Sequence, residues 1–138
     1  MREQAWLDFL NDAYNCLITK DPLAFQDMTP SRVPEEAGVY LITALVDGRE
    51  KPYYVGRSTN LRQRLYSNHL MGRPSGNARL KKYLIETGEC RDAEHAKAFL
   101  RSNCQVRWLL EADIRKRGAL EGYLTGVLFP KHGISVEH

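Results

Sequence analysis

The alternation of apolar and polar residues along this 138-residue chain predicts a small mixed α/β domain. In residues 2–18, apolar side chains recur on one helical face, as expected for an amphipathic helix: Trp6, Leu10, Ala13, Tyr14 and Leu17. Residues 38–46 (GVYLITALV) and 52–58 (PYYVGRS) are rich in β-branched and aromatic residues, which favour strands. The short turn at Asp47-Gly48 joins them, so we expect an antiparallel hairpin.

The remaining sequence predicts an irregular connector, four further helices and one further strand. The connector carries prolines at positions 22, 30 and 34. Helices are expected at 61–70, at 78–87, from about Asp92 and from Asp113 to before Pro130, with CQVRWLLE at 104–111 as a strand. We therefore expect an α/β fold with a three-stranded antiparallel sheet flanked by helices and preceded by an N-terminal helical extension.

Composition excludes several classes of protein. Hydrophobic residues make up 43% and charged residues 27% of the chain, which is ordinary for a globular domain. No apolar run approaches the ~20 residues of a membrane span, and the N-terminus lacks a signal peptide's apolar stretch, so we expect a cytoplasmic protein without a membrane partner. The three cysteines, Cys16, Cys90 and Cys104, are widely spaced, which argues against a disulfide framework or a metal cluster.

Positive charge is concentrated in one segment. Residues 51–85 contain eight Lys or Arg residues and no Asp or Glu, whereas the rest of the chain has a net charge of −5. A solvated surface is one interpretation of such a segment. The other is a polyanion partner, because phosphates gain from clustered cations and release counterions when they bind.

The hairpin places two tyrosines close together. Side chains alternate along a strand, so Tyr40 and Tyr54 can share one face of the sheet, with Gly56 beside them. A glycine inside a strand often marks close approach by a ligand or another backbone. The alternative is that both tyrosines line the rim of the core and that Gly56 forms a bulge.

These residues resemble the GIY-YIG nuclease family. Gly38-Val39-Tyr40 and Tyr54-Val55-Gly56 stand in place of the two triplets that name the family, Arg64 matches a helical arginine ten residues after the second tyrosine, and Glu121 matches a late helical glutamate. The resemblance covers roughly residues 37–130. It implies a small standalone member, with an N-terminal helix and connector at 1–36 and a GIY-YIG-like domain at 37–138, that acts as an endonuclease on DNA.

Glu121 falls among apolar positions on the last helix. On a helical wheel it lies inside the arc of Leu120, Leu124, Leu128 and Ile114, where a carboxylate needs a partner. A salt bridge to Arg117, one turn earlier, is one possibility. The other, to which the resemblance points, is a divalent cation, Mg²⁺ or Mn²⁺, since Mg²⁺ suits one or two carboxylates completed by water and phosphate oxygens.

The resemblance assigns roles to individual residues. It implies that Tyr40 is the general base, which would need nearby cations or a concerted proton transfer to act at neutral pH. Tyr54 would position water or phosphate, Arg64 would bind the phosphate, and Glu121 would hold the metal. Five basic residues would follow the nucleic-acid backbone: Arg57, Arg62, Arg79, Lys81 and Lys82.

The chain departs from the family pattern at two places. A His or Tyr often stands four residues after the helical arginine, where this chain has Asn68, followed by His69. Either the helix is irregular and His69 enters the site as a proton relay, or Asn68 occupies that place. The family also often has an asparagine near its C-terminal end, where this chain has PKHGI, and His132 is a candidate substitute.

Two other functions compete with a nuclease. The domain could bind nucleic acid without cutting it, or it could bind a protein partner and carry a basic surface that is only solvated. The sequence does not distinguish single-stranded, duplex or branched DNA, and it does not set the oligomeric state.

Overall fold

The computed structural model describes residues 2–134, so Met1 and the last four residues of the predicted domain 37–138 lie outside the described residues. Its strands form one antiparallel sheet in the order β1-β4-β2-β3. The strands are β1 (Leu23–Ala24), β2 (Gly38–Val46), β3 (Arg49–Ser58) and β4 (Cys104–Leu110). The three predicted strands are present, and the two-residue β1 adds a fourth at the edge.

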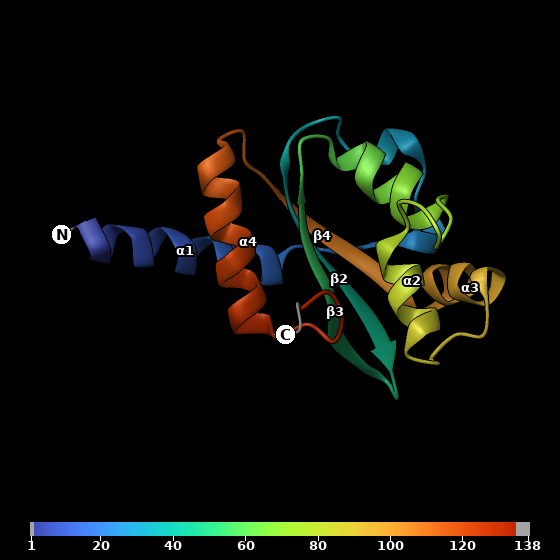
Figure 1. The fold of residues 1–138 in the computed structure, drawn as a ribbon. Helices are drawn as coiled ribbons and strands as arrows, with labels where there is room; N and C mark the ends of the chain where they lie inside the picture. Colours follow the sequence, from blue (N-terminus) through green and yellow to red (C-terminus); the bar gives the residue numbers. More distant parts are fainter. Residues whose placement is uncertain (1, 135–138) are drawn as a thin grey trace.

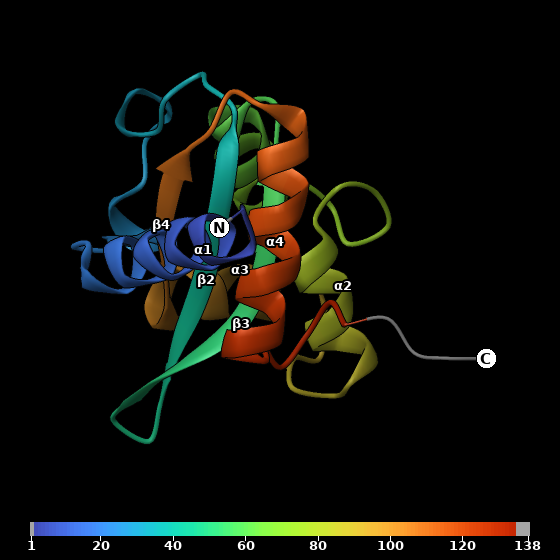
Figure 2. The same cartoon turned by 90° about the vertical axis from the view of Figure 1, so that its left-hand side faces the viewer.

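Helices cover both faces of the sheet (Figure 1). On one face lie α1 (Arg2–Thr19) and α4 (Ile114–Leu128), and on the other lie η3 (Gln63–Leu70), α2 (Arg79–Glu86) and α3 (Ala93–Asn103). Figure 2 shows α1 crossing the sheet and meeting α4. Among residues 2–134, none of the helices combines the length and the hydropathy needed to cross a bilayer.

Alternation along β2 divides the core into two. Val39 and Leu41 pack toward α4, in a cluster with Leu120 and Leu124. Tyr40, Ile42 and Ala44 face the opposite way, in a larger cluster with apolar residues of η3, α2 and α3. Side chains at alternate positions of a strand point to opposite faces, so one strand supplies both cores.

The connector belongs to the packed domain. Leu23 and Ala24 of β1 pair with Val106 and Gln105 of β4, and two short 3₁₀ turns follow, η1 (Phe25–Asp27) and η2 (Pro30–Arg32). Buried side chains from this segment join the larger core: Phe25, Met28 and Val33. The predicted division between residues 36 and 37 is therefore not a boundary in the packing.

A β-bulge turns two adjacent tyrosines toward the same core. Ile42 pairs with Tyr54 but its neighbour Thr43 pairs with Pro52, which leaves Tyr53 as an extra residue in β3. Bulges re-aim side chains in this way. Tyr53 and Tyr54 both lie in the larger cluster and are both nearly buried, although adjacent strand residues ordinarily face opposite sides.

Gly56 makes room for a neighbouring side chain. It pairs directly with Tyr40, and a Cβ atom built on Gly56 would lie 2.4 Å from the Cζ and Oη atoms of Tyr40. The ring of Tyr40 therefore crosses the bare backbone of Gly56. The sequence had suggested a ligand or another backbone at this position, but the close neighbour is the Tyr40 ring.

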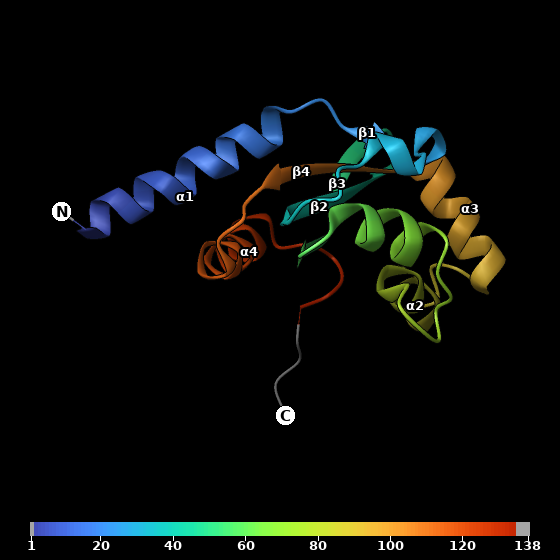
Figure 3. The same cartoon turned by 90° about the horizontal axis from the view of Figure 1, so that it is seen from above.

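The segment after α4 runs along the outer edge of β3. The amide of Lys131 donates to the carbonyl of Pro52 (3.1 Å), and the amide of His132 donates to that of Tyr53 (3.0 Å). Figure 3 shows this segment passing between α4 and the side that carries η3 and α2. It covers a strand edge that would otherwise be open for pairing.

We expect Gly56→Ala to lower the free energy of unfolding by about 1–3 kcal/mol, because the added methyl overlaps a ring that has no free space to move into. Chemical denaturation checks this value. Gly126→Ala is the matched control, because a Cβ atom there meets nothing within 4 Å and should stabilise α4 by up to about 1 kcal/mol. Equal stability changes in the two variants would contradict the packing described for Tyr40.

Candidate active site

The helix that carries Arg64 has an irregular hydrogen-bond spacing. The side chain of Asn60 accepts from the amide of Gln63 (3.1 Å) near its start. From Gln63 to Leu70 it is a π-helix, and the amide of Met71 donates to the carbonyl of Tyr66, five residues earlier (3.0 Å). In this spacing, Arg64 and the residue five positions later lie on the same side.

That residue is His69, which is buried. Its Nε2 atom and the hydroxyl of Tyr40 form a hydrogen bond of 2.8 Å. Of the two alternatives left open by the sequence, the structure has the irregular helix with His69 beside Tyr40, while Asn68, the preceding residue, is half-buried. The sequence could not show this, because helical periodicity assumes a regular helix.

Burial keeps both hydrogen-bonded groups neutral near pH 7. It raises the pKa of Tyr40 well above its usual range, and the nearby Tyr54 adds to this effect. It lowers the pKa of His69 to about 3, helped by the positive charges of Arg64, Lys81 and Arg79. The charge of Arg64 acts to lower the pKa of Tyr40 but does not outweigh burial, so the cations do not produce a ready tyrosinate.

His69 has one unused polar atom. Its Nδ1 atom is buried and has no hydrogen-bond partner among the described residues. A neutral imidazole carries its proton on one nitrogen, so when Nε2 accepts from the Tyr40 hydroxyl, Nδ1 holds the proton. An unpaired buried polar atom is costly, and such atoms concentrate at functional sites.

Tyr54 completes an aromatic group around His69. Its ring stacks on Tyr40, with 6.2 Å between centroids and 21° between planes, and meets His69 edge-on at 5.1 Å. Burial raises the pKa of Tyr54, and the positive charges of Arg79 and Arg64 oppose that rise. The three rings thus lie next to two guanidinium groups from η3 and α2.

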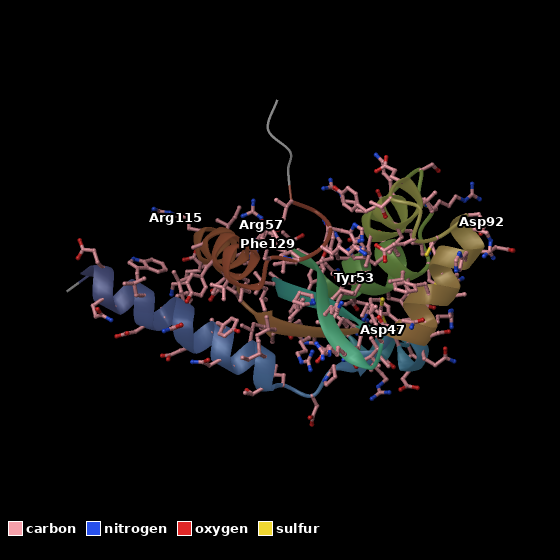
Figure 4. All side chains as sticks on the ribbon, turned by 90° about the horizontal axis from the view of Figure 1, so that it is seen from below. Asp47, Tyr53, Arg57, Asp92, Arg115 and Phe129 are labelled. Carbon is pink, nitrogen blue, oxygen red and sulfur yellow. The ribbon has the colours of Figure 1, made fainter. Side chains whose placement is uncertain are left out.

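Glu121 lies at the edge of β3, partly open to solvent. Its side chain is 33% exposed, and its Oε1 atom is 3.5 Å from Nε of Arg57 (Figure 4 shows Arg57 beside α4). Its negative charge is close enough to contribute to the raised pKa of Tyr40. Although α4 packs on the opposite face, Glu121 therefore reaches the strand edge where the Tyr40 hydroxyl lies.

Of the two alternatives for Glu121, the salt bridge to Arg117 does not form. Nη1 of Arg117 instead donates to the carbonyls of Glu111 (3.1 Å) and Ala112 (2.8 Å). The helical wheel was also wrong about Ile114, which is exposed and not part of the apolar face. The wheel could not detect that the first two residues of α4, Ile114 and Arg115, are exposed.

The fit of a metal ion depends on Glu121 alone. Residues 2–134 hold no group of three or more His, Cys, Asp or Glu side chains arranged for a metal. A single, partly exposed carboxylate does suit Mg²⁺, which keeps several waters and takes its other ligands from substrate. It does not suit a zinc site, which needs three or four nitrogen or sulfur ligands.

Of the five residues predicted to bind the nucleic-acid backbone, two are exposed and unpaired within residues 2–134, two are paired with carboxylates, and one, Lys81, is buried. Arg79 and Lys82 are exposed, and no carboxylate of residues 2–134 lies within ion-pair distance of either. Arg57 is exposed but paired with Glu121, and Arg62 is held by Glu35 and the carbonyl of Val33.

Lys81 was expected to follow the nucleic-acid backbone, but its side chain is buried. It is 2% exposed, and its Nζ atom donates to the carbonyls of Leu70 and Gly72 at the end of η3. Burial lowers its pKa to about 8. Its role in this structure is to close the irregular helix, which a charge count along the sequence cannot reveal.

A neighbouring polar cluster escaped the sequence analysis. The carboxylate of Glu89 accepts from the hydroxyl of Tyr53 (2.7 Å), pairs with Lys131 (2.9 Å) and bonds to Nε2 of His132 (2.8 Å). These contacts fix the segment after α4 on β3. His132 therefore bonds to Glu89 and not to Tyr40 or His69, and Glu89 belongs to no motif that could have pointed to it.

We expect the buried neutral His69 to make stability pH-dependent. Its pKa is about 6.5 when unfolded and about 3 when folded, so the unfolded state binds more protons between these values. The free energy of unfolding should therefore fall by about 1.4 kcal/mol for each pH unit below 6.5 because of this residue. Urea denaturation from pH 7 to pH 4 should show a smaller loss in His69→Gln than in the wild type; equal losses would contradict the assignment.

Comparisons with known proteins found one family model and two solved structures that are similar to this chain. A family model described as the GIY-YIG catalytic domain matches residues 36–101. Two crystal structures of point mutants of the GIY-YIG N-terminal endonuclease domain of UvrC from Thermotoga maritima, each bound to its catalytic divalent cation, are 22% and 21% identical to this chain. Each comparison covers 75% of this chain and 88% of that domain, with TM-scores of 0.44 and 0.43.

A comparison with curated proteins gives no match. The family match includes Tyr40, Tyr54, Arg64 and His69 and ends before α4, so Glu121 lies outside it. The family match shows that residues 36–101 of this chain belong to the GIY-YIG family.

Proposed function

We propose that this protein is a divalent-metal-dependent endonuclease that hydrolyses phosphodiester bonds in DNA. The observation that carries the proposal is the buried hydrogen bond between Tyr40 and His69, in a place where the charges of Arg64 and Glu121 both act on the Tyr40 hydroxyl. A structural hydrogen bond alone would not need a cation and a carboxylate from two other elements beside it. Hydrolysis of a phosphodiester needs a proton acceptor, a cation for the phosphate and help for the leaving oxygen.

Arg64 is the residue proposed to bind the reacting phosphate. Its guanidinium is half-buried next to Tyr40 and Tyr54, and within residues 2–134 no carboxylate is paired with it. A guanidinium donates two parallel hydrogen bonds to a phosphate, and its positive charge offsets the negative charge that develops in the transition state. The hydroxyl of Tyr54 is proposed to orient the attacking water or a phosphate oxygen.

The proton of the attacking water is proposed to move through Tyr40. Because Tyr40 is a neutral phenol, it can accept that proton only as it gives its own to Nε2 of His69. The imidazole then carries a positive charge, which its low pKa opposes. A bound phosphate lessens this opposition, because its negative charge offsets the charges of Arg64 and Arg79 that contribute to the low pKa.

Glu121 is the residue proposed to hold the metal, Mg²⁺ or Mn²⁺. When bound there, such an ion would polarise the phosphate and neutralise charge on the leaving oxygen. The Glu121 side chain is partly exposed and is paired with Arg57 at 3.5 Å, longer than a direct hydrogen bond. Exchanging this loose ion pair for a cation would cost little, since exposed pairs contribute about 0–1 kcal/mol.

We expect Glu121→Gln to abolish Mg²⁺-dependent cutting while leaving folding and DNA binding intact. The variant removes a metal ligand, and the loss of a carboxylate reduces repulsion of phosphates. Its free energy of unfolding should change by no more than about 1 kcal/mol, because the partner of Glu121 is an exposed arginine. Cleavage assays with Mg²⁺, Mn²⁺ or EDTA and denaturation of the same samples measure both effects.

The substrates for this test are single-stranded, duplex and branched DNA of the same sequence. A Glu121→Gln protein that still cuts would remove Glu121 from the mechanism. A wild-type protein that binds these DNAs but cuts none of them with either metal would instead identify a nucleic-acid-binding module without nuclease activity.

We expect the adjacent residues Lys81 and Lys82 to behave differently when each is changed to Ala. Lys82→Ala should keep its stability and weaken DNA binding, with a salt dependence that is shallower by about one phosphate contact. Lys81→Ala should lose about 1–3 kcal/mol of stability, because two carbonyls lose a charged donor. The reverse pattern, a stable Lys81→Ala protein with weakened binding, would contradict the buried position of Lys81.

A further inference from the structure

A pocket of about 240 Å³ lies between the end of β3 and the start of α4. Three arginines line it together with a short polar segment: Arg57, Ser58, Thr59, Arg64, Ile114 and Arg117. Neither Tyr40, Tyr54 nor Glu121 lines it, so it is a neighbour of the proposed reaction centre and not the same space. At about 30 Å³ for one water molecule, the pocket has room for a phosphate group and some water.

Arg117 is the residue that makes this pocket unusual. It is 6% exposed, and one of its nitrogens is fixed by the carbonyls of Glu111 and Ala112. Among residues 2–134, no carboxylate lies within 4.0 Å of its guanidinium. A nearly buried charge without a counter-ion is costly, so this position favours an anion.

Arg57 is directed to the pocket by a glycine. A Cβ atom on Gly118 would lie 2.6 Å from Nη1 of Arg57, so the guanidinium rests on bare helix backbone one turn before Gly122. Its Nε atom faces Glu121, which leaves the two terminal nitrogens for another acceptor. Any side chain at position 118 would displace the Arg57 guanidinium and leave the charge of Arg57 unchanged.

We propose that this arginine pocket binds a phosphate group of the nucleic acid, one next to the phosphate that undergoes hydrolysis. The proposal rests on the proposed nuclease function and specifies the substrate contact on the α4 side of the site. Arg64 lines the pocket and also lies beside Tyr40, so it links the two phosphates. Planar guanidinium groups suit phosphate oxygens in pairs, and a multiply charged anion satisfies three cations better than a single carboxylate.

The test compares Gly118→Ala with Gly122→Ala, using inorganic phosphate as the probe. Both changes add a methyl to α4, but a Cβ atom at position 122 meets nothing within 4 Å. Melting temperatures are measured in EDTA at constant ionic strength, with chloride replaced stepwise by phosphate. We expect phosphate to raise the melting temperature of the wild type and of Gly122→Ala, with an apparent Kd about tenfold weaker in Gly118→Ala.

Arg117→Gln provides a second variant of the pocket. In Arg117→Gln, phosphate should no longer raise the melting temperature. A lower melting temperature of this variant without phosphate does not affect the result, because each protein is compared with itself. If phosphate stabilises all four proteins equally, or none of them, the arginine pocket is not a phosphate site. A loss in Gly118→Ala and Arg117→Gln but not in Gly122→Ala supports it.

The position of the bound phosphate in a strand is tested with one oligonucleotide carrying either a 5′-phosphate or a 5′-hydroxyl. A binding gain from the 5′-phosphate that disappears in Gly118→Ala assigns the pocket to a terminal phosphate. Equal weakening of both oligonucleotides in Gly118→Ala assigns it to a backbone phosphate. Both results support the proposal, whereas unchanged binding in Gly118→Ala contradicts it.

These measurements are independent of cutting. If phosphate has the expected effect and the wild type does not cut DNA, the nuclease proposal is contradicted and the phosphate-site proposal is supported. If the wild type cuts DNA and phosphate has no effect, the phosphate-site proposal is contradicted and the nuclease proposal is supported.

Discussion

The contact between the Tyr40 ring and the backbone of Gly56 determines the rest of the site. A side chain at position 56 would occupy the space of the phenol, so the glycine allows Tyr40 to lie across β3 with its hydroxyl at the strand edge. There the hydroxyl forms a hydrogen bond with His69 of η3, and the negative charge of Glu121 on α4 helps to raise its pKa. Elements from both faces of the sheet can act on one group only because that group reaches the edge between them.

Two irregularities bring the remaining side chains to this edge. The five-residue spacing in η3 places His69 on the same side as Arg64, and the bulge in β3 turns Tyr53 and Tyr54 toward the same core. Tyr54 then packs against Tyr40 and His69, while Tyr53 holds Glu89 and, through it, the segment after α4. Both irregularities forgo regular hydrogen bonding, a cost that proteins often retain at functional sites.

The features that follow regular periodicity could be predicted from the sequence. The hairpin, the third strand and the helices appear within a few residues of their expected places, and Tyr40 and Tyr54 share a face as alternation required. The features that depend on departures from periodicity could not. The sequence raises an irregular η3 only as one of two alternatives and does not decide between them. It gives no sign that Lys81 is buried, or that Glu121 pairs with Arg57 and not with Arg117. A charge count gives the sign of a surface but not which cations are already bound to carbonyls.

The central claim is that the buried Tyr40 hydroxyl takes part in phosphodiester hydrolysis and does not merely fill the core. The most direct measurement is the Mg²⁺-dependent rate of DNA cleavage by Tyr40→Phe, made alongside its DNA affinity and its denaturation curve. The account predicts a folded protein that binds DNA as the wild type does and cuts at least about 100-fold more slowly, since a positioned proton acceptor contributes about that much. A Tyr40→Phe protein that cuts DNA at the wild-type rate would contradict it.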